Sequence, residues 1–312
     1  FCLLLRQCTD RSGRRQSPPG ALFAGPVGKY LYAMNRVERA RELRKFIKKR
    51  ERVLIQTHDY PDPDAIAAAF GLCYLVEHYG GTSGVIYHGV INRAITAEMV
   101  SVLKIPIIPA AGVLSDSSDE VIVVDTRIAA TNLTRLAARY IGEVDHHQGG
   151  ESPGAGIFHD LRPEYGSCST IVGEYFHILR VRMPENVATA LSIGLNTDTQ
   201  RLLRNVSRYD VAGYYYLYRQ SDQAFLQYVL LNNMEMADLP VFVAAINNLV
   251  VDKNSFMAYT DIGEIKSGAL AAIVGDFILT IKEVNVVLTA CWDQERLYLS
   301  VRSEAERLPA DR

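Results

Sequence analysis

The sequence predicts an α/β protein: a domain built on a parallel sheet, a helical linker and a smaller, C-terminally incomplete α/β lobe. Two observations lead to this fold class. Apolar runs such as 53–55 and 121–124 alternate with helix-like segments as far as Gly149-Gly150, and almost wholly apolar strands are typical of parallel sheets buried on both faces. After these glycines, consecutive helical segments lead into a second alternation of strands and helices.

The first half of the chain is expected to begin with a helix over 37–52, whose apolar face carries Val37, Ala40 and Leu43. Its other face is rich in Arg and Lys, which is typical of a solvated helix face; a nucleic-acid-binding arm is the alternative. The elements expected after it are strands at 53–57, 85–88, 121–125 and 141–144 and helices at 65–76, 94–103 and 133–140.

The second half is expected to be helical first and mixed afterwards. Helices are expected at 170–179, 184–195, 209–220, 222–231 and 239–250. The remaining expected elements are a strand at 256–260, a helix at 268–281 and strands at 284–292 and 296–303, with residues 293–295 as a hairpin turn.

Composition narrows the class of protein. With 312 residues, of which 48% are hydrophobic, the chain has room for two domains with sizeable cores. A formal net charge of −2 argues against a strongly basic nucleic-acid-binding protein. Five cysteines without paired spacing indicate reduced thiols. No apolar run reaches the length of a membrane span, so we expect a cytoplasmic protein without a membrane partner. Residues 1–33, with several Gly, Pro, Ser and Arg, are expected to be a disordered leader.

Three side chains that can bind a cation follow the first expected strand. His58, Asp62 and Asp64 lie within seven residues, at the carboxyl end of that strand, where open α/β sheets place their binding sites. One imidazole and two carboxylates are costly to hold together unless a cation neutralises them. The alternative is an acidic turn in which Asp64 caps the following helix.

Further acidic and histidine residues end other expected elements. Asp125 ends one strand, Asp145-His146-His147 ends the next, and Asp198 follows an apolar helix. Each alone has an ordinary explanation as a cap, a turn or a surface loop. Together they indicate one site, because the strand ends of a parallel sheet converge. Asp and His ligands without Cys favour manganese or magnesium over structural zinc.

These residues resemble the four motifs of the DHH phosphoesterase superfamily. The resemblance covers about residues 53–200 in the family's order: His58-x-x-x-Asp62-x-Asp64, Val124-Asp125, Asp145-His146-His147 and Asp198. The superfamily includes RecJ exonucleases, manganese pyrophosphatases, nanoRNases that also dephosphorylate pAp, and cyclic-dinucleotide phosphodiesterases. The expected organisation is a leader at 1–33, a DHH domain at 34–225, a helical linker at 226–252 and a partial DHH-associated substrate-binding domain at 253–312. The last is expected to be incomplete because the family's glycine-rich segment is absent.

The resemblance implies a centre of two manganese ions, with magnesium as the alternative. His58, Asp62 and Asp125 would hold one ion, and Asp64, Asp125, His146 and Asp198 the other, so that Asp125 bridges. Asp145 would orient the histidines, and His147 would contact the scissile phosphate. Two arginines are further candidates for substrate binding: Arg302, in the strand Leu299–Ser303, and Arg127, for which a surface salt bridge is equally plausible.

The function implied is hydrolysis of phosphoester bonds in short nucleotides, either oligoribonucleotides or pAp, by a metal-activated water. A soluble cyclic- or linear-dinucleotide phosphodiesterase is the alternative within the enzyme class. A non-catalytic nucleotide-binding regulatory protein is the alternative outside it, although all six ligand positions are chemically intact. The expected partner is a nucleotide or a short oligonucleotide, and a homodimer is left open.

Overall fold

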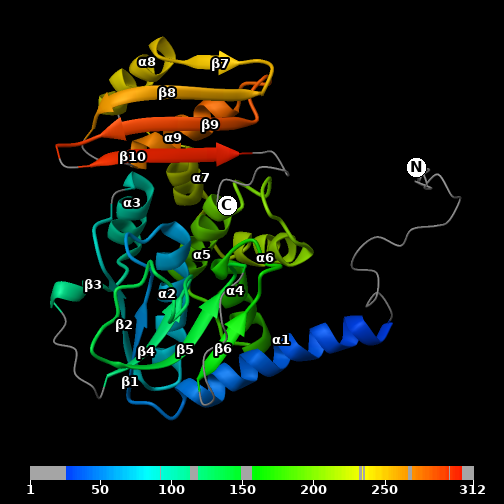
Figure 1. The fold of residues 1–312 in the computed structure, drawn as a ribbon. Coiled ribbons are helices and arrows are strands. Elements are labelled where there is room, and N and C mark those ends of the chain that lie inside the picture. Colours follow the sequence, from blue (N-terminus) through cyan, green and yellow to red (C-terminus); the bar gives the residue numbers. More distant parts are fainter. Residues whose placement is uncertain are drawn as a thin grey trace, which may run out of the picture.

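A six-stranded parallel sheet, sheet A, forms the first lobe of the computed structural model, which describes residues 26–303 except 92, 113–118, 149–156, 232–233, 235, 266–268 and 295. All of its strand pairs are parallel. Its spatial order is β3-β2-β1-β4-β5-β6 (Figure 1). The strands are β1 (Arg52–Gln56), β2 (Thr82–Tyr87), β3 (Ile107–Pro109), β4 (Glu120–Val124), β5 (Arg139–Asp145) and β6 (Phe158–Leu161).

The strand order contains one reversal, between β1 and β4. From β1 the chain builds outward through β2 to β3, then returns to the other side of β1 and builds through β4, β5 and β6. In open α/β sheets, ligands bind at the carboxyl ends of the strands where the order reverses. The loop after β1 carries His58, and Asp125 follows β4 directly. The topology therefore places these two candidate ligands side by side.

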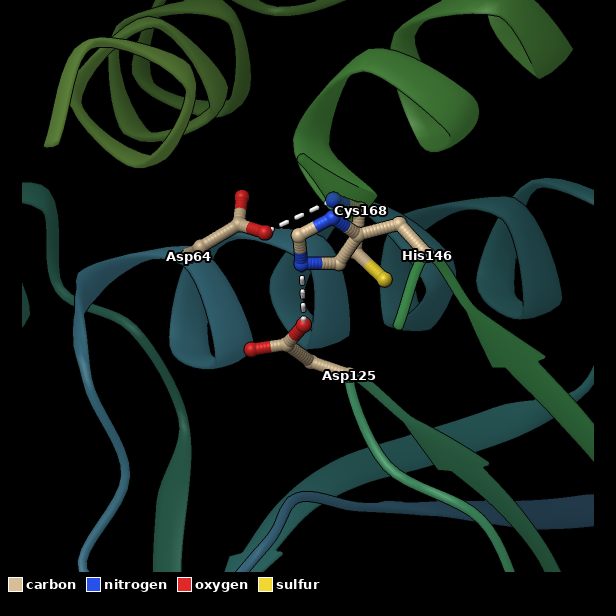
Figure 2. A group of neighbouring side chains, drawn as sticks. All are labelled: Asp64, Asp125, His146 and Cys168. Atoms are coloured by element: carbon tan, nitrogen blue, oxygen red, sulfur yellow. Dashed lines mark hydrogen bonds and ion pairs between the residues drawn. The ribbon is translucent and has the colours of Figure 1, made fainter. Parts of the chain in front are cut away.

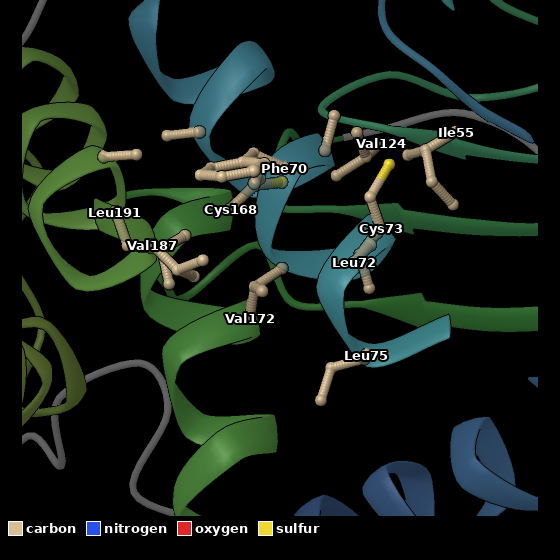
Figure 3. Packing of buried hydrophobic residues seen from close by; sticks show 14 of the residues in the cluster. Ile55, Phe70, Leu72, Cys73, Leu75, Val124, Cys168, Val172, Val187 and Leu191 are labelled. Atoms are coloured by element: carbon tan, nitrogen blue, oxygen red, sulfur yellow. The ribbon is translucent and has the colours of Figure 1, made fainter. Parts of the chain in front are cut away.

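Helices cover one face of sheet A. They are α1 (Pro26–Ile47), α2 (Pro63–His78), α3 (Ala94–Leu103), α4 (Cys168–Leu179), α5 (Glu185–Asp198), α6 (Arg208–Tyr218) and α7 (Gln223–Leu231). The small side chains Ala67, Ala68 and Gly71 let α2 lie close to α4 and α5, with Val172 directly against Gly71. Figure 3 shows how Phe70 and Leu72 of α2 pack with Val172 and Leu191 in this core. The first three turns of α2 are buried almost entirely, and they fix the position of the loop before it.

The other face of sheet A is covered without a helix between β4 and β5, so the helix expected at 133–140 is wrong. Leu133 packs against the sheet from an irregular segment, and Tyr140 is already in β5. Hydrogen bonds with Gln56 of β1 and Tyr140 of β5 take the place of helical ones. Gln56 donates to the Thr134 carbonyl at 2.8 Å, and the Tyr140 hydroxyl accepts from the Leu136 amide at 2.7 Å and donates to Gln56 at 2.8 Å.

Sheet B forms the second lobe and mixes strand directions. Its order is β10-β9-β8-β7, with a parallel β8–β9 pair between two antiparallel pairs. Its elements are α8 (Leu239–Asn247), β7 (Val250–Asp252), β8 (Met257–Glu264), α9 (Ala269–Leu279), β9 (Val286–Trp292) and β10 (Leu297–Ser303), preceded by the short 3-10 turn η3 (Met236–Asp238). A second, separate core lies between this sheet and its two helices. The α/β fold class with a smaller second lobe is thus confirmed.

Several boundaries differ from expectation. α1 begins at Pro26, inside the range expected to be a leader, whereas residues 1–25 and 304–312 lie outside the described part of the chain. The helix expected at 239–250 ends at Asn247, because Val250 pairs with Tyr259 in sheet B. Three strands were not expected at all: β3, β6 and β7, which are only three or four residues long.

The two cores separate between α7 and α8. Leu226 and Val229 belong to the first core, and Phe242 and Ala245 to the second. By length and composition alone, Gln223–Asn247 could span a membrane, contrary to the expectation that no stretch would reach that length. In the structure this stretch is divided between α7, η3 and α8, and each of the two α-helices buries part of its apolar surface in its own lobe.

Candidate metal centre

The loop between β1 and α2 presents His58 and two carboxylates at the switch point. Asp62 is the N-cap of α2, and its Oδ1 accepts from the amides of Asp64 and Ala65 at 3.0 and 3.1 Å. The cap is therefore Asp62 and not Asp64. These two bonds use Oδ1, so the second oxygen of Asp62 remains available for another contact. His58 lies with its Nε2 3.7 Å from Oδ2 of Asp125.

Asp64 is fully buried and is held by the amino end of α4. Its two carboxylate oxygens accept from the backbone amides of Cys168 and Ser169 at 2.7 and 2.9 Å, and Figure 2 shows the bond to Cys168. Amides at a helix N-terminus favour a negative charge. Burial, followed by repulsion from Asp125 and Asp198, nevertheless holds the pKa of Asp64 well above its ordinary value. The carboxylate of Asp64 therefore needs a nearby cation in order to be charged.

Asp125 lies at the centre of the group. It follows β4 with φ 60°, a left-handed conformation that non-glycine residues adopt mainly where the surroundings impose it. Its Oδ1 lies 3.3 Å from Nε2 of His146, yet both of these buried atoms lack a hydrogen bond of acceptable geometry. The two atoms form an ion pair when the ring is charged, and an ion bound between them would account for the missing hydrogen bond.

His146 is oriented by the chain behind it. Its Nδ1 lies 3.1 Å from the carbonyl oxygen of Tyr165, the second hydrogen bond that metal-binding histidines usually make. Its Nε2 also lies 3.1 Å from Oδ2 of Asp198, the last residue of α5. Although burial disfavours the charged ring, the Asp125 and Asp198 carboxylates raise the pKa of His146 to about 12. In the metal-free protein this ring is therefore protonated.

The donor atoms fit divalent ions. Three sets each have all ligand atoms within 4.8 Å of one another: His58, Asp62 and Asp125; Asp64, Asp125, His146 and Cys168; and Asp125, Asp145 and His147. Asp125 belongs to every set, which is the arrangement that a bridging ligand requires. The unbonded oxygen of Asp125 and the unbonded nitrogen of His146 are also accounted for by an ion, so the residues present fit the expected metal.

Asp145 is engaged in positioning its neighbours. It accepts from Nε of Arg127 at 2.9 Å, and its Oδ1 lies 2.8 Å from Nδ1 of His147. Burial tends to raise the pKa of Asp145, but the contacts with His147 and Arg127 outweigh it and the pKa is lowered. The hydrogen bond to Asp145 in turn raises the pKa of His147. The His147 ring is 58% exposed, which leaves it accessible to a substrate.

The two candidate arginines have protein partners. Arg127 forms the salt bridge with Asp145, and its Nη2 donates to the His147 carbonyl at 2.7 Å. Arg302 lies in β10, the edge strand of sheet B, where its Nε donates to Asp276 of α9 at 2.9 Å. In Figure 1, β10 is the strand of sheet B nearest to the first lobe.

Two residues of this centre escaped sequence reasoning. Cys168 was grouped with the scattered cysteines, and Tyr165 contributes through its backbone carbonyl, which no side-chain pattern reveals. A signal for Cys168 did exist: Gly166-Ser167-Cys168-Ser169 is a run of small residues in which Ser167 caps α4, a usual start for a helix that receives an anion.

A comparison with known protein families identifies the family to which the first lobe is similar. Residues 52–195 match the sequence model of the DHH family, N-terminal domain. These residues form a DHH-family domain. The match contains β1 to β6 and most of α5, so it includes every candidate ligand at the edge of sheet A except Asp198.

Three curated proteins are similar in sequence to this chain. The uncharacterized protein MJ1633 of Methanocaldococcus jannaschii is 29% identical over 83% of this chain and 54% of its own length. The cyclic-di-AMP phosphodiesterase GdpP of Geobacillus thermodenitrificans is 26% identical over 78% of this chain and 39% of its own. A probable manganese-dependent inorganic pyrophosphatase of Lactococcus lactis is 29% identical over 48% of this chain and 49% of its own. The chain thus spans about half, or less, of these relatives.

The fold is shared with a solved structure across both lobes. An exopolyphosphatase-related protein from Bacteroides fragilis superposes with a TM-score of 0.72 and 18% sequence identity, covering 86% of this chain and 84% of its own. At this identity the likeness shows the fold alone. It extends beyond the DHH domain, because coverage of this extent must include part of sheet B.

Proposed function

We propose that this protein is a manganese-dependent phosphohydrolase that cleaves phosphoester bonds in short nucleotides, such as oligoribonucleotides or pAp. The observation that carries the proposal is the shared position of Asp125, which belongs to each donor set at the switch point of sheet A. One carboxylate that serves two cation positions supports a centre with two metals. Magnesium is the alternative ion, because the donors other than Cys168 are oxygen and nitrogen atoms.

The protein's own residues would bind the two ions as follows. His58, Asp62 and Asp125 would hold one ion, and Asp64, Asp125, His146 and Asp198 the other. When bound, such ions lower the pKa of water and neutralise charge on phosphoryl oxygens.

The remaining candidates would act on the substrate. His147, whose raised pKa keeps its ring protonated into higher pH, would donate a hydrogen bond or a proton to the phosphate. Asp145 would hold the His147 ring in position, and Arg127 would fix both residues and present its remaining donors to a phosphate oxygen. Arg302 would bind a terminal phosphate of the substrate.

A cyclic- or linear-dinucleotide phosphodiesterase is a second candidate within the same chemistry. The similarity to GdpP favours it, because that match covers more of this chain than the match to the pyrophosphatase does. For either candidate we propose a cytoplasmic protein with a nucleotide as its partner. A homodimer is compatible with either.

The test is an activity panel on metal-stripped protein after manganese is added. The substrates are pAp, linear dinucleotides, cyclic dinucleotides, long single strands and pyrophosphate. We expect phosphate release from pAp or mononucleotide release from short oligonucleotides, and neither product without metal. Preference for cyclic dinucleotides would support the second candidate. Manganese binding without hydrolysis of any substrate would refute the proposal and favour a nucleotide-binding regulatory protein.

A further inference from the structure

Cys168 lies inside the metal centre, although nothing in the DHH motifs calls for a thiol there. Its Sγ belongs to a set with Asp64, Asp125 and His146 in which all ligand atoms lie within 4.8 Å of one another. Figure 2 shows these four side chains converging from the start of α2, the end of β4, the end of β5 and the start of α4.

The position of the thiol is fixed. Cys168 is the first residue of α4, is fully buried, and donates its backbone amide to Asp64. Its Sγ lies 3.7 Å from the Val144 carbonyl, also contacts the carboxylate of Asp125, and forms no disulfide. A cysteine so confined cannot turn toward solvent, so its sulfur stays beside the donors of Asp64 and Asp125.

A second observation points to a ligand at this place. Asp125 is 3% exposed, and neither its Oδ1 nor Nε2 of His146 has a hydrogen bond of acceptable geometry among the described residues, although the two atoms lie 3.3 Å apart and Nε2 lies 3.1 Å from Asp198. These two unsatisfied atoms belong to the same set as the thiol. An ion that satisfied them would therefore also lie within reach of sulfur.

Sulfur changes which ion is preferred. Manganese and magnesium favour oxygen and nitrogen donors, whereas a donor set that adds a thiolate to an imidazole and carboxylates suits zinc and cobalt. The other set, His58, Asp62 and Asp125, contains no sulfur.

We propose that Cys168 is an additional ligand of the position assigned above to Asp64, Asp125, His146 and Asp198, and that this position takes an ion of the zinc class, while the His58 position takes manganese. The inference rests on the metal centre of the proposed function. It makes the two positions chemically unequal and predicts that traces of zinc compete with manganese at one of them only.

Cobalt provides a direct test, because a bond between cobalt(II) and a thiolate gives a charge-transfer absorption band in the near ultraviolet. Metal-free full-length protein is titrated with CoCl2, and the band is expected in the unsubstituted protein. It should disappear in Cys168→Ser and persist in Cys73→Ser. Cys73 is a matched control, because it is also a buried free thiol of the first core but lies in none of the metal-binding sets.

Zinc and manganese affinities, measured by calorimetry on the same proteins, give the second readout. Zinc binds most sites more tightly than manganese, so the test is how each metal's affinity changes between the unsubstituted protein and the variants. Replacing a group that only hydrogen-bonds to a metal ligand changes metal affinity roughly 10- to 100-fold. Loss of a ligand itself should therefore weaken zinc binding about tenfold or more. Manganese affinity should change less than about twofold, since manganese gains little from sulfur.

A cobalt complex of the unsubstituted protein without the band would overturn the inference, and this measurement needs no variant to fold. A band that survives in Cys168→Ser, or in Cys168→Ala if the serine variant is unstable, would overturn it as well. If manganese binds and nucleotides are hydrolysed but no thiolate band is seen, only this inference fails. If no divalent ion binds at all, the proposed function fails with it.

Discussion

Asp125 carries the strongest prediction at the scale of single residues. Because it belongs to each donor set, Asp125→Asn should remove charge from both metal positions at once. Asp62→Asn, which changes one set, is the matched control. Calorimetric titration with MnCl2 should show both binding events weakened in Asp125→Asn and one in Asp62→Asn. Two unchanged binding events in Asp125→Asn would refute the bridging assignment.

The adjacent histidines should separate into two roles. His146 is buried between Asp125, Asp198 and the Tyr165 carbonyl, whereas His147 is exposed and bonded to Asp145. His146→Ala should therefore reduce manganese content. His147→Ala should retain the metal and reduce kcat on the preferred nucleotide about 100-fold or more, as loss of a proton donor does. If metal analysis gave the opposite result, the two roles would be exchanged. Small and equal effects of the two substitutions would exclude both the ligand role of His146 and the proton-donor role of His147.

Protonation of the metal-free centre gives a pH prediction. The pKa of His146 is raised to about 12, far above its value of about 6.5 in an unfolded chain. The stabilisation from this charged ring is fully present below pH of about 6.5 and is lost as pH rises toward 12. A bound metal must displace the proton, so manganese affinity should rise with pH. Calorimetry in buffers of different ionisation enthalpy should detect proton release; binding without it would contradict the assignment of His146.

At the scale of elements, the contact between α5 and α2 should be sensitive at Gly194. A Cβ at this position would lie 2.8 Å from Oδ1 of Asp64 and 3.0 Å from its Cα, and would also strike Ser169. Gly194→Ala should destabilise the fold by about 1–3 kcal/mol through overpacking, and should weaken metal binding by moving Asp64.

The matched control is Gly173→Ala in α4, where the nearest atom of Leu217 is 3.4 Å away. This variant should have the stability of the unsubstituted protein or slightly more, because alanine restricts the unfolded chain. Urea unfolding and manganese titration of both variants make the comparison. If both lose stability equally, the contact with Asp64 is not the cause.

Elements with a strong periodic pattern could be predicted from the sequence, and those held by distant partners could not. The buried strands β1 and β4 and the helix α2 were expected because their apolar content is dictated locally. The segment 133–138 has leucines at helical spacing, but its polar groups bond to Gln56 and Asp59, which are remote in the chain, and to Tyr140, which already belongs to β5. Nothing within the segment itself indicates those bonds.

The candidate site was predictable to a similar degree. Side chains at the ends of strands form a pattern along the chain, so His58, Asp125 and His146 could be expected to meet. The carbonyl of Tyr165 and the thiol of Cys168 reach the same place only because α4 begins there. Their roles depend on the arrangement of β5, β6 and α4 and on no residue type that a motif would specify.

At the scale of the whole molecule, Arg302 tests whether sheet B takes part in binding substrate. If it holds a terminal phosphate, Arg302→Lys should raise KM for a nucleotide several-fold, because lysine cannot form the two-point contact of a guanidinium. Hydrolysis of a small activated phosphodiester, which does not reach sheet B, should be nearly unchanged. Asp276→Asn is the control, because it removes the partner of Arg302 and leaves the guanidinium in place. Equal losses on both substrates would make Arg302 structural.

The reversal of strand order in sheet A also has a consequence for how the protein folds. β1 pairs with β2, which follows it closely, and with β4, which joins only after β2, α3 and β3 have been added to the other side. Pairings between such distant segments form slowly, because a long loop must be closed before the contact is made. The donors of the centre are distributed over the same distant segments. Acquisition of metal during refolding would therefore report the closing of the β1–β4 pair, and would lag behind the appearance of helix.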